Sequence, residues 1–260
     1  MEDSRRNFLK IAGISALGLG AGPVLDAFAK EQDFQAPRII QGENALKGTH
    51  WGMVVDTRKI HSPEDLSPMI AACNKIHNIP ELETENHEIK WIWAEAYHNA
   101  FPEKETEFLN EHLEHIVLPV LCNHCEDPPC CRACPTQATF KRESDGIVMM
   151  DFHRCIGCRF CMAACPYGAR SFNFRDPRPF IRETNLEFPT RMKGVVEKCS
   201  FCAERLAEGK LPACVEASNG ILIFGDLDDP QSEVRQVLRE NYTIRRKQNL
   251  GTGPSVYYIV

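Results

Sequence analysis

The placement of the cysteines constrains this chain more than any other feature. The chain has 260 residues and thirteen cysteines, and nine of the thirteen fall between Cys122 and Cys165. The overall density is below that of a small disulfide-stapled domain, whose cysteines exceed roughly 8–10% of the residues. The dense stretch therefore needs sulfur for a local purpose, and the spacing of the cysteines indicates which one.

The dense stretch contains two groups of four cysteines. The first is Cys122-x2-Cys125-x4-Cys130-x3-Cys134-Pro135, and the second is Cys155-x2-Cys158-x2-Cys161-x3-Cys165-Pro166. The second group matches the bacterial ferredoxin run, in which three thiolates hold one cubane and the fourth ligates the other cluster. Exchange of the fourth cysteines predicts one [4Fe–4S] cluster on Cys122, Cys125, Cys130 and Cys165. It predicts another on Cys134, Cys155, Cys158 and Cys161.

Other uses of cysteine fit this spacing less well. Zinc sites use paired C-x2-C knuckles with four ligands per ion and require no distant fourth cysteine followed by Pro. A triplet with two-residue gaps cannot pair all of its members in disulfides. Haem attachment needs C-x-x-C-H, and no C-x-x-C in this chain is followed by His. The spacing favours iron–sulfur clusters, with zinc as the weaker alternative.

A third group, Cys199-x2-Cys202-x11-Cys214, has Ser218 where a fourth cysteine is expected. It resembles the last cysteine group of the four-cluster ferredoxin-type subunits of dimethyl sulfoxide reductase, polysulfide reductase and formate dehydrogenase complexes. The resemblance covers most of residues 50–260, including W-G-M-V-V-D at 51–56, the hairpin at 146–151 and F-G-D-L at 224–227. It implies an α+β fold with two pseudo-symmetric ferredoxin-like subdomains of the bacterial 2[4Fe–4S] type, carrying helical and loop insertions.

The chain departs from that family in its first cysteine group. This group follows the W-G-M strand in the family, but residues 61–70 contain no cysteine here, and only Cys73 stands at the position of the group's fourth cysteine. By the exchange rule, the cluster that needs the three absent cysteines and position 218 is lost as a whole. The remaining cluster is expected on Cys73, Cys199, Cys202 and Cys214, which makes three clusters. A lone cysteine is more often a small buried apolar residue, and we interpret Cys131 in that way.

The chain is expected to divide into four parts. Residues 1–29 have the layout of a twin-arginine export signal, with Arg5-Arg6, an apolar stretch and the cleavage site Ala27-Phe28-Ala29; an uncleaved anchor helix is the alternative. Residues 30–49 form an N-terminal extension. Residues 50–121 and 196–260 are predicted to form the first ferredoxin-like subdomain with one cluster. Residues 122–195 are predicted to form the second, with two clusters.

Local patterns predict several elements. Helices are expected at 85–99 and 103–115, as a helical insertion over about 85–115 in which Trp91 and Trp93 anchor the core or an interface. Strands are expected at 117–121, 146–151 and 221–224, and a turn with a surface helix at 226–240. His112 and His115 are expected on a solvated face. His124 and His153 are also interpreted as surface residues, the alternative being hydrogen bonds to cluster sulfur.

The sequence favours an electron-transfer subunit without chemistry of its own. A net charge of −6 offers no footprint for nucleic acid, and the chain has no P-loop, dinucleotide fingerprint or Ser-His-Asp set. Wrapping three clusters leaves little chain for a substrate pocket. An enzyme with an internal active site is the alternative, and clusters that only stabilise the fold are a third possibility.

The resemblance also implies a location and partners. Within the family, the chain is most similar to exported iron–sulfur subunits of the Dsr or Hdr-like menaquinol-oxidising complexes of sulfur metabolism. This implies a periplasmic relay that meets the cytoplasmic membrane through a polytopic quinone-interacting subunit, with the cluster built mainly from the second cysteine group nearest the membrane. The lost cluster normally faces a molybdopterin subunit in the family, so no molybdopterin partner is expected. The resemblance to the Dsr or Hdr-like complexes implies a multihaem cytochrome c as the second partner. The alternative is a polysulfide, nitrite or dimethyl sulfoxide reductase-type complex with a catalytic partner.

Overall fold

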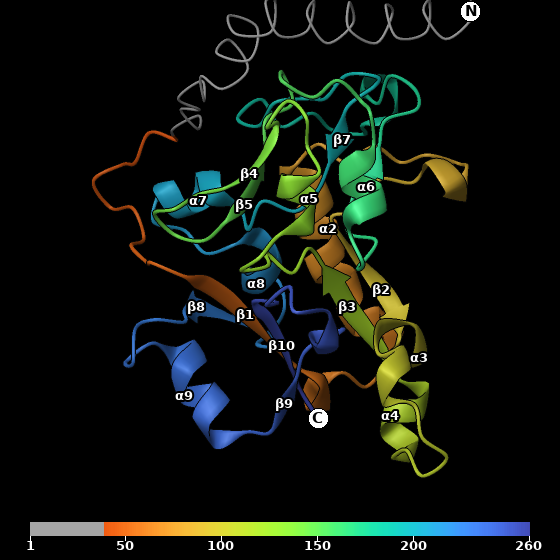
Figure 1. The fold of residues 1–260 in the computed structure, drawn as a ribbon, viewed down its shortest axis with the longest axis vertical. Helices are drawn as coiled ribbons and strands as arrows, with labels where there is room; N and C mark the ends of the chain where they lie inside the picture. Colours follow the sequence, from red (N-terminus) through yellow and green to blue (C-terminus); the bar gives the residue numbers. More distant parts are fainter. Residues whose placement is uncertain (1–38) are drawn as a thin grey trace, which may run out of the picture. The chain divides into compact units, whose positions relative to one another are not determined.

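A four-stranded sheet joins the two ends of the part of the chain that the computed structural model describes, residues 39–260 (Figure 1). Its strand order is β8-β1-β10-β9, with β1 at Trp51–Asp56, β8 at Leu222–Asp226, β9 at Thr243–Ile244 and β10 at Val256–Ile259. β1 runs antiparallel to β8 and parallel to β10. The strand predicted at 221–224 is confirmed, as is the W-G-M strand that the resemblance to the family implied.

Both faces of this sheet are covered, which explains why all six residues of β1 are buried. Val54 packs with Leu227 and Val234 beneath the helix α9 (Glu233–Glu240). Met53 and Val55 belong to the main core on the opposite face. The alternation of sides along one strand thus serves two cores, as strand geometry requires. The surface helix expected within 226–240 is confirmed.

A second sheet replaces the helix predicted at 85–99, which is wrong. Residues Glu85–His87 form the 3-10 turn η3, β2 spans Ile92–Ala96, and α3 spans only Tyr97–Ala100. β2 pairs antiparallel with β3 (Val117–Leu121), so the strand predicted at 117–121 is confirmed. The apolar and aromatic side chains of 91–93 pack in this two-stranded ribbon, and this tertiary pairing overrides helix propensity.

The helix predicted at 103–115 is mostly wrong as well. Pro102–Lys104 form η4, and α4 covers only Glu111–His115. α4 begins late because Asn110 caps it, its side chain accepting a hydrogen bond from the His112 amide at 2.9 Å. The insertion over 85–115 is therefore a strand followed by short helices, rather than a helical insertion.

The cysteine-rich part of the chain is built from hairpins and short helices. β4 (Thr139–Lys141) pairs with β5 (Val148–Met150), which confirms the predicted hairpin, and β6 (Ser171–Phe172) pairs with β7 (Val196–Glu197). The helices are α2 (Ser67–Ile76), α5 (Pro129–Arg132), α6 (Phe160–Ala164), α7 (Ala203–Ala207) and α8 (Ala213–Glu216). Further 3-10 turns are η1 (Thr57–Lys59), η2 (Pro63–Leu66), η5 (Arg178–Phe180) and η6 (Gln248–Leu250).

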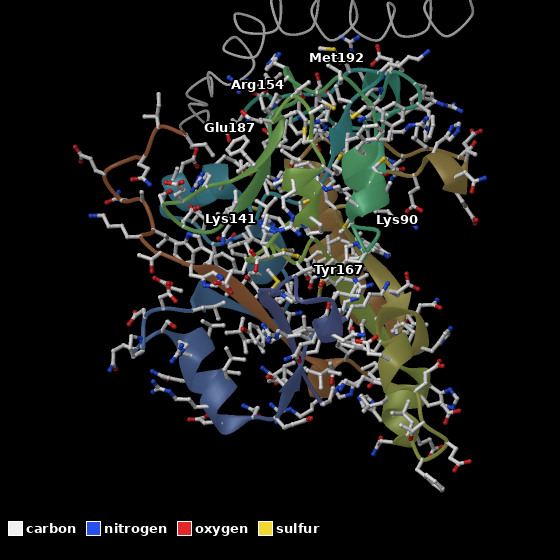
Figure 2. The ribbon with its side chains drawn as sticks, in the orientation of Figure 1. Lys90, Lys141, Arg154, Tyr167, Glu187 and Met192 are labelled. Carbon is white, nitrogen blue, oxygen red and sulfur yellow. The ribbon has the colours of Figure 1, made fainter. Side chains whose placement is uncertain are left out.

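The described residues belong to one compact unit, and its division into two ferredoxin-like subdomains stays a prediction. The hairpin β4–β5 with α5 and α6 lies above the four-stranded sheet in Figure 1. Tyr167 lies between these parts, near the middle of Figure 2, where its hydroxyl is hydrogen-bonded to Thr252 Oγ1. The predicted export signal lies outside the described residues. Within the described residues, every helix is too short or too polar to cross a membrane.

Candidate metal centres

Left-handed backbone turns place the cysteines of each C-x-x-C loop. Gly157, between Cys155 and Cys158, has φ +69°, and a Cβ added there would lie 2.3 Å from the Gly194 carbonyl oxygen. Arg159 and Cys202 adopt φ values of 64° and 50°, respectively, immediately before α6 and α7. Such residues reverse the chain direction within one step and so bring successive sulfurs to the same side of the loop.

The first set of thiols, here called the central set, consists of Cys122, Cys125, Cys130 and Cys165. Cys125 has the other three as close electrostatic neighbours, although Cys165 is separated from it by 40 positions in the chain. Burial, with smaller contributions from these neighbouring thiols, raises the pKa of Cys125 to about 12. The fold therefore gathers the four residues that the exchange rule assigns to one cluster.

The second set, here called the outer set, consists of Cys134, Cys155, Cys158 and Cys161. All four line one small cavity, together with the apolar side chains of Ile156 and Val196. Cys158 is exposed, whereas Cys161 is buried. Burial raises the pKa of Cys134, but hydrogen bonds from the backbone of Thr139 and from Thr136 outweigh it and lower that pKa. The outer set is thus the one open to solvent.

The third set, here called the α2 set, consists of Cys73, Cys199, Cys202 and Cys214. α2 carries Cys73 and packs against α8, which carries Cys214. Burial raises the pKa of Cys73 well above its ordinary value, and the close thiols of Cys214, Cys202 and Cys199 raise it further. All four residues are buried. Tertiary packing thereby brings Cys73 to a group that begins 126 positions later in the sequence.

The three sets are adjacent in a fixed order. Cys122 of the central set is a neighbour of Cys199 of the α2 set, and Cys130 of the central set is a neighbour of Cys161 of the outer set. All twelve of these cysteines are free thiols. Four neighbouring buried thiols suit a [4Fe–4S] cluster or a tetrahedral zinc ion. Burial favours the protonated thiol, and a bound metal takes the place of the proton on sulfur.

Cys131 and Ser218 lie beside these sets without joining them. Cys131 is hydrogen-bonded to Cys130; this bond lowers the pKa of Cys130 to about 5 against the effect of burial and raises that of Cys131. Ser218 is 1% exposed. Its hydroxyl donates to the Val215 carbonyl at 2.8 Å and accepts from the Leu222 amide at 3.1 Å, which closes the loop between α8 and β8.

The interpretation of His124 as a surface residue is wrong. His124 is 1% exposed, stacks on Phe201 with ring centroids 3.7 Å apart, and accepts a hydrogen bond from the Val148 amide at 3.1 Å. Burial, followed by the charges of Lys198 and Arg170, lowers the pKa of His124 well below its usual value. The ring is therefore neutral inside the core. His112, His115 and His153 are exposed, as predicted.

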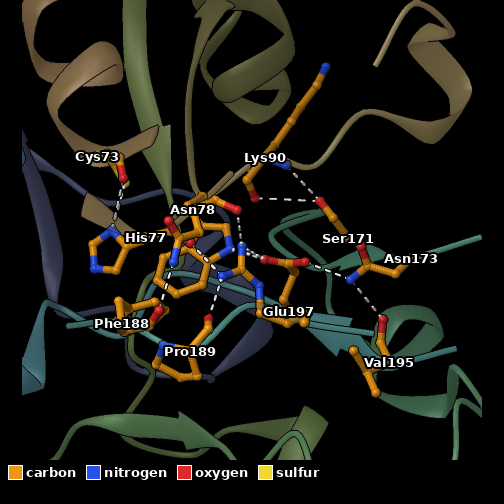
Figure 3. Close-up of polar contacts among 12 residues, drawn as sticks. Cys73, His77, Asn78, Lys90, Ser171, Asn173, Phe188, Pro189, Val195 and Glu197 are labelled. Atoms are coloured by element: carbon orange, nitrogen blue, oxygen red, sulfur yellow. Dashed lines mark hydrogen bonds and ion pairs between the residues drawn. The ribbon is translucent and has the colours of Figure 1, made fainter. Parts of the chain in front are cut away.

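His77 is a site residue that the sequence did not single out. It is 1% exposed, its Nδ1 lies 3.5 Å from Cys73 Sγ, and its Nε2 lies 2.9 Å from Glu204 Oε1. Figure 3 places His77 beside Cys73 at one side of a buried polar network. The sequence did carry a signal, because residues four apart on a helix share a face.

Buried cations were missed for a different reason. Arg191 is paired with Glu197 at 2.7 Å, and the guanidinium also donates to the carbonyls of His77 and Asn78 at the end of α2 (Figure 3). Arg170 and Lys198 are buried beside the thiol sets. No short motif distinguishes a buried arginine or lysine from the exposed ones that are far more common.

Comparisons with known proteins identify relatives of this chain that are iron–sulfur subunits. Residues 113–177 match a 4Fe-4S dicluster domain. Iron-sulfur subunit 1 of the Hdr-like menaquinol oxidoreductase of Archaeoglobus fulgidus is 41% identical over 98% of this chain and 97% of that protein. The iron-sulfur cluster-binding subunit of menaquinone reductase from Nitratidesulfovibrio vulgaris is 35% identical over 80% of this chain and 88% of its own length. A tetrathionate reductase subunit of Salmonella typhimurium is 32% identical over 100% of this chain and 89% of that protein. These similarities favour iron–sulfur clusters over zinc.

Proposed function

Because the chain belongs to the family of iron–sulfur subunits of menaquinol oxidoreductases and related reductase complexes, we propose that it relays electrons through three [4Fe–4S] clusters. The observation that carries this proposal is the succession of three four-thiol sets in the order α2 set, central set, outer set. A bound cluster accepts and returns one electron at a time. The chain's own residues supply the thiolates, exclude water and fix the order of the sets.

The two ends of this series differ in exposure, which supports separate contact points for two partners. Beside the exposed Cys158 of the outer set, Ile156 is 66% exposed and Phe160 is 60% exposed. Apolar side chains around an accessible ligand favour close contact with another protein. We assign this end to a polytopic quinone-interacting membrane subunit.

The α2 set is the other end, and it is buried. One partly exposed polar neighbour of this set is Glu204, whose side chain is 28% exposed and contacts His77. We assign this end to a second redox subunit. Residues 61–70 lack the cysteines of the cluster that faces a molybdopterin subunit in the family, and the resemblance to Hdr-like complexes favours a multihaem cytochrome c in its place. The similarity to a tetrathionate reductase subunit favours the second candidate, a relay to a catalytic reductase subunit.

The proposed location is the extracytoplasmic face of the cytoplasmic membrane, in a respiratory complex of sulfur metabolism. Its support is the twin-arginine pattern at Arg5-Arg6 with the small-residue site at 27–29. That export route carries folded proteins, so clusters inserted before export are compatible with free thiols in an oxidising compartment. Attachment to the membrane then comes from the partner subunit.

Metal analysis of the purified chain tests the proposal. Three clusters require about twelve irons and twelve sulfides per chain, and the dithionite-reduced protein should give the EPR signal of interacting [4Fe–4S]⁺ centres. Reduction by a menaquinol analogue should require the membrane subunit. About eight irons, or zinc in place of iron, would contradict the three-cluster relay.

A further inference from the structure

Two buried cations lie between the thiol sets without an acidic partner. Arg170 is 5% exposed and Lys198 is 2% exposed, and within the described residues neither forms an ion pair with a carboxylate. A buried charge without a counter-charge is costly. Among the described residues, the groups beside Arg170 and Lys198 that can carry negative charge are the thiols of the sets.

Arg170 lies between the central and the outer set. Its charge acts most strongly on Cys130 and Cys161, one from each set, and then on Cys122 and Cys165. Its Nη2 donates to Thr139 Oγ1 at 2.8 Å, while its buried Nε has no hydrogen-bond partner. The guanidinium is thus held in place by one neutral hydroxyl and otherwise faces sulfur.

Lys198 lies between the central set and the α2 set. Its ammonium donates to the carbonyl oxygens of Val148 and Cys199. Its charge acts on Cys199 of the α2 set and on Cys130 of the central set. The central set therefore has a cation on each side, and each of the other two sets has one.

Arg191 provides the contrast inside the same molecule. It is as deeply buried as Lys198, and it has a carboxylate partner, Glu197, at 2.7 Å. Arg191, which joins Glu197 to the end of α2, therefore has its own counter-charge. The absence of an acid beside Arg170 and Lys198 assigns their balancing charge to the thiolate sets.

We propose that Arg170 and Lys198 set the redox potentials of the three clusters, each raising the potentials of the two clusters between which it lies. A [4Fe–4S] cluster with four thiolates becomes more negative by one charge when reduced, so a nearby fixed positive charge favours the reduced form. Both cations raise the redox potential of the central cluster. This inference rests on the proposed three-cluster relay. Neither side chain supplies a ligand, so both act on the clusters through their charge alone.

EPR-monitored redox titration of single variants tests the assignment. Arg170→Met should lower the midpoint potentials of the outer and central clusters and leave that of the α2-set cluster unchanged. Lys198→Met should lower those of the central and α2-set clusters and leave the outer one unchanged. We expect the affected equilibria to change at least tenfold, which corresponds to 59 mV for one electron. Arg178→Gln, at an exposed arginine paired with Asp176, is the control that should change none.

Charge-preserving and charge-compensating variants separate electrostatics from packing. Arg170→Lys should retain potentials close to those of the wild type. Met150→Glu places a carboxylate beside Arg170, whose Nη1 lies 3.9 Å from Met150 Sδ, and should reproduce the pattern of Arg170→Met with the arginine intact. Met150→Gln is its matched control. This second route applies even if the Arg170→Met protein fails to assemble.

Iron content distinguishes the two possible failures. A wild-type chain with fewer than three clusters would overturn the proposed relay, whatever the potentials are. If three clusters are present and their potentials are unchanged in Arg170→Met and Met150→Glu, or shift equally in all three centres, the role of the cations is overturned. The proposed relay would not be contradicted by that result.

Discussion

At the scale of single residues, neighbours in sequence have different environments. Cys130 and Cys131 are adjacent in α5, yet Cys130 is a neighbour of Cys125 and Cys161, whereas Cys131 is half-buried and lies 4.0 Å from Thr139 Oγ1. Cys73 is isolated in sequence and lies among three other thiols in space. Position in the fold, rather than local cysteine density, therefore distinguishes the proposed ligands from the bystander.

Paired alanine variants test this distinction. Cys73→Ala should convert one [4Fe–4S] cluster to a three-iron form or abolish it, because the α2 set loses its only ligand from α2. Cys131→Ala should leave all three clusters in place, because Cys131 contributes only a hydrogen bond to Cys130. EPR and iron analysis of the two purified variants provide the measurement. An unchanged spectrum for Cys73→Ala, or a lost cluster for Cys131→Ala, would overturn the ligand assignment.

At the scale of elements, the cysteine loops depend on close backbone approach. The loop that carries Cys155 and Cys158 packs directly on the segment before β7. In addition, the Val196 amide donates to Cys155 Sγ at 3.4 Å, so β7 also contributes a hydrogen bond to the outer set. The geometry of this set is therefore shared between one loop and a strand far away in sequence.

Two glycine substitutions isolate that packing. Gly157→Ala should destabilise the outer cluster, because its Cβ would meet the Gly194 carbonyl oxygen at 2.3 Å in addition to the strain of a positive φ. Gly168→Ala has a similar φ of +64° but nothing within 4 Å of the added Cβ, so it should lower the free energy of unfolding by only about 1–2 kcal/mol, the cost of a left-handed backbone. Thermal unfolding and outer-cluster EPR intensity compare the two. If both variants lower stability and outer-cluster EPR intensity equally, the close approach of Gly157 to Gly194 does not contribute to the stability of the outer cluster.

At the scale of the whole molecule, burial determines the protonation of many of the thiols before metal binds. Burial raises the pKa values of Cys125 and Cys214 to about 12, so these groups are protonated in the metal-free protein at neutral pH. Iron must displace these protons, and assembly is consequently coupled to pH across the α2 and central sets. Cys134 of the outer set and Cys130 of the central set differ, because hydrogen bonds lower their pKa values.

Cluster release should therefore depend on pH with a definite sign. Lower pH favours the protonated thiols, so anaerobic transfer of iron to a chelator should be faster at about pH 6 than at about pH 8. The ratio of the two rates should be larger for the α2-set cluster, whose four thiols all have raised pKa values, than for the outer cluster, in which the pKa of Cys134 is lowered. EPR during chelation follows each centre. Faster release at the higher pH would contradict the argument.

The proposed export has its own test. Replacement of both Arg5 and Arg6 by Lys preserves charge but removes the pair that the export receptor recognises. The variant should remain in the cytoplasm with its clusters intact. Fractionation with an antibody against the folded chain, and EPR of the cytoplasmic protein, measure both outcomes. Normal extracytoplasmic accumulation would count against the twin-arginine assignment.

The sequence by itself determined those features that short-range spacing encodes. The cysteine runs predicted iron–sulfur chemistry and the family, which the comparisons confirm. Apolar runs predicted the strands at 117–121 and 221–224, and the resemblance to the family implied the strand at 51–56, because each strand is a short continuous stretch. The central and outer sets also follow from spacing, since a loop with fixed gaps can direct only certain sulfurs to one side. The assignment of Cys73 to the α2 set came instead from the resemblance to the family.

The tertiary structure decided the features that depend on distant partners. Residues 92–96 form a strand because β3 pairs with them, and His124 is buried because Phe201 and β5 enclose it. Arg170 and Lys198 are ordinary cations in the sequence, and only the fold places them between thiol sets without an acid. Burial and charge compensation are sums over long-range contacts, so no local window of the sequence contains them.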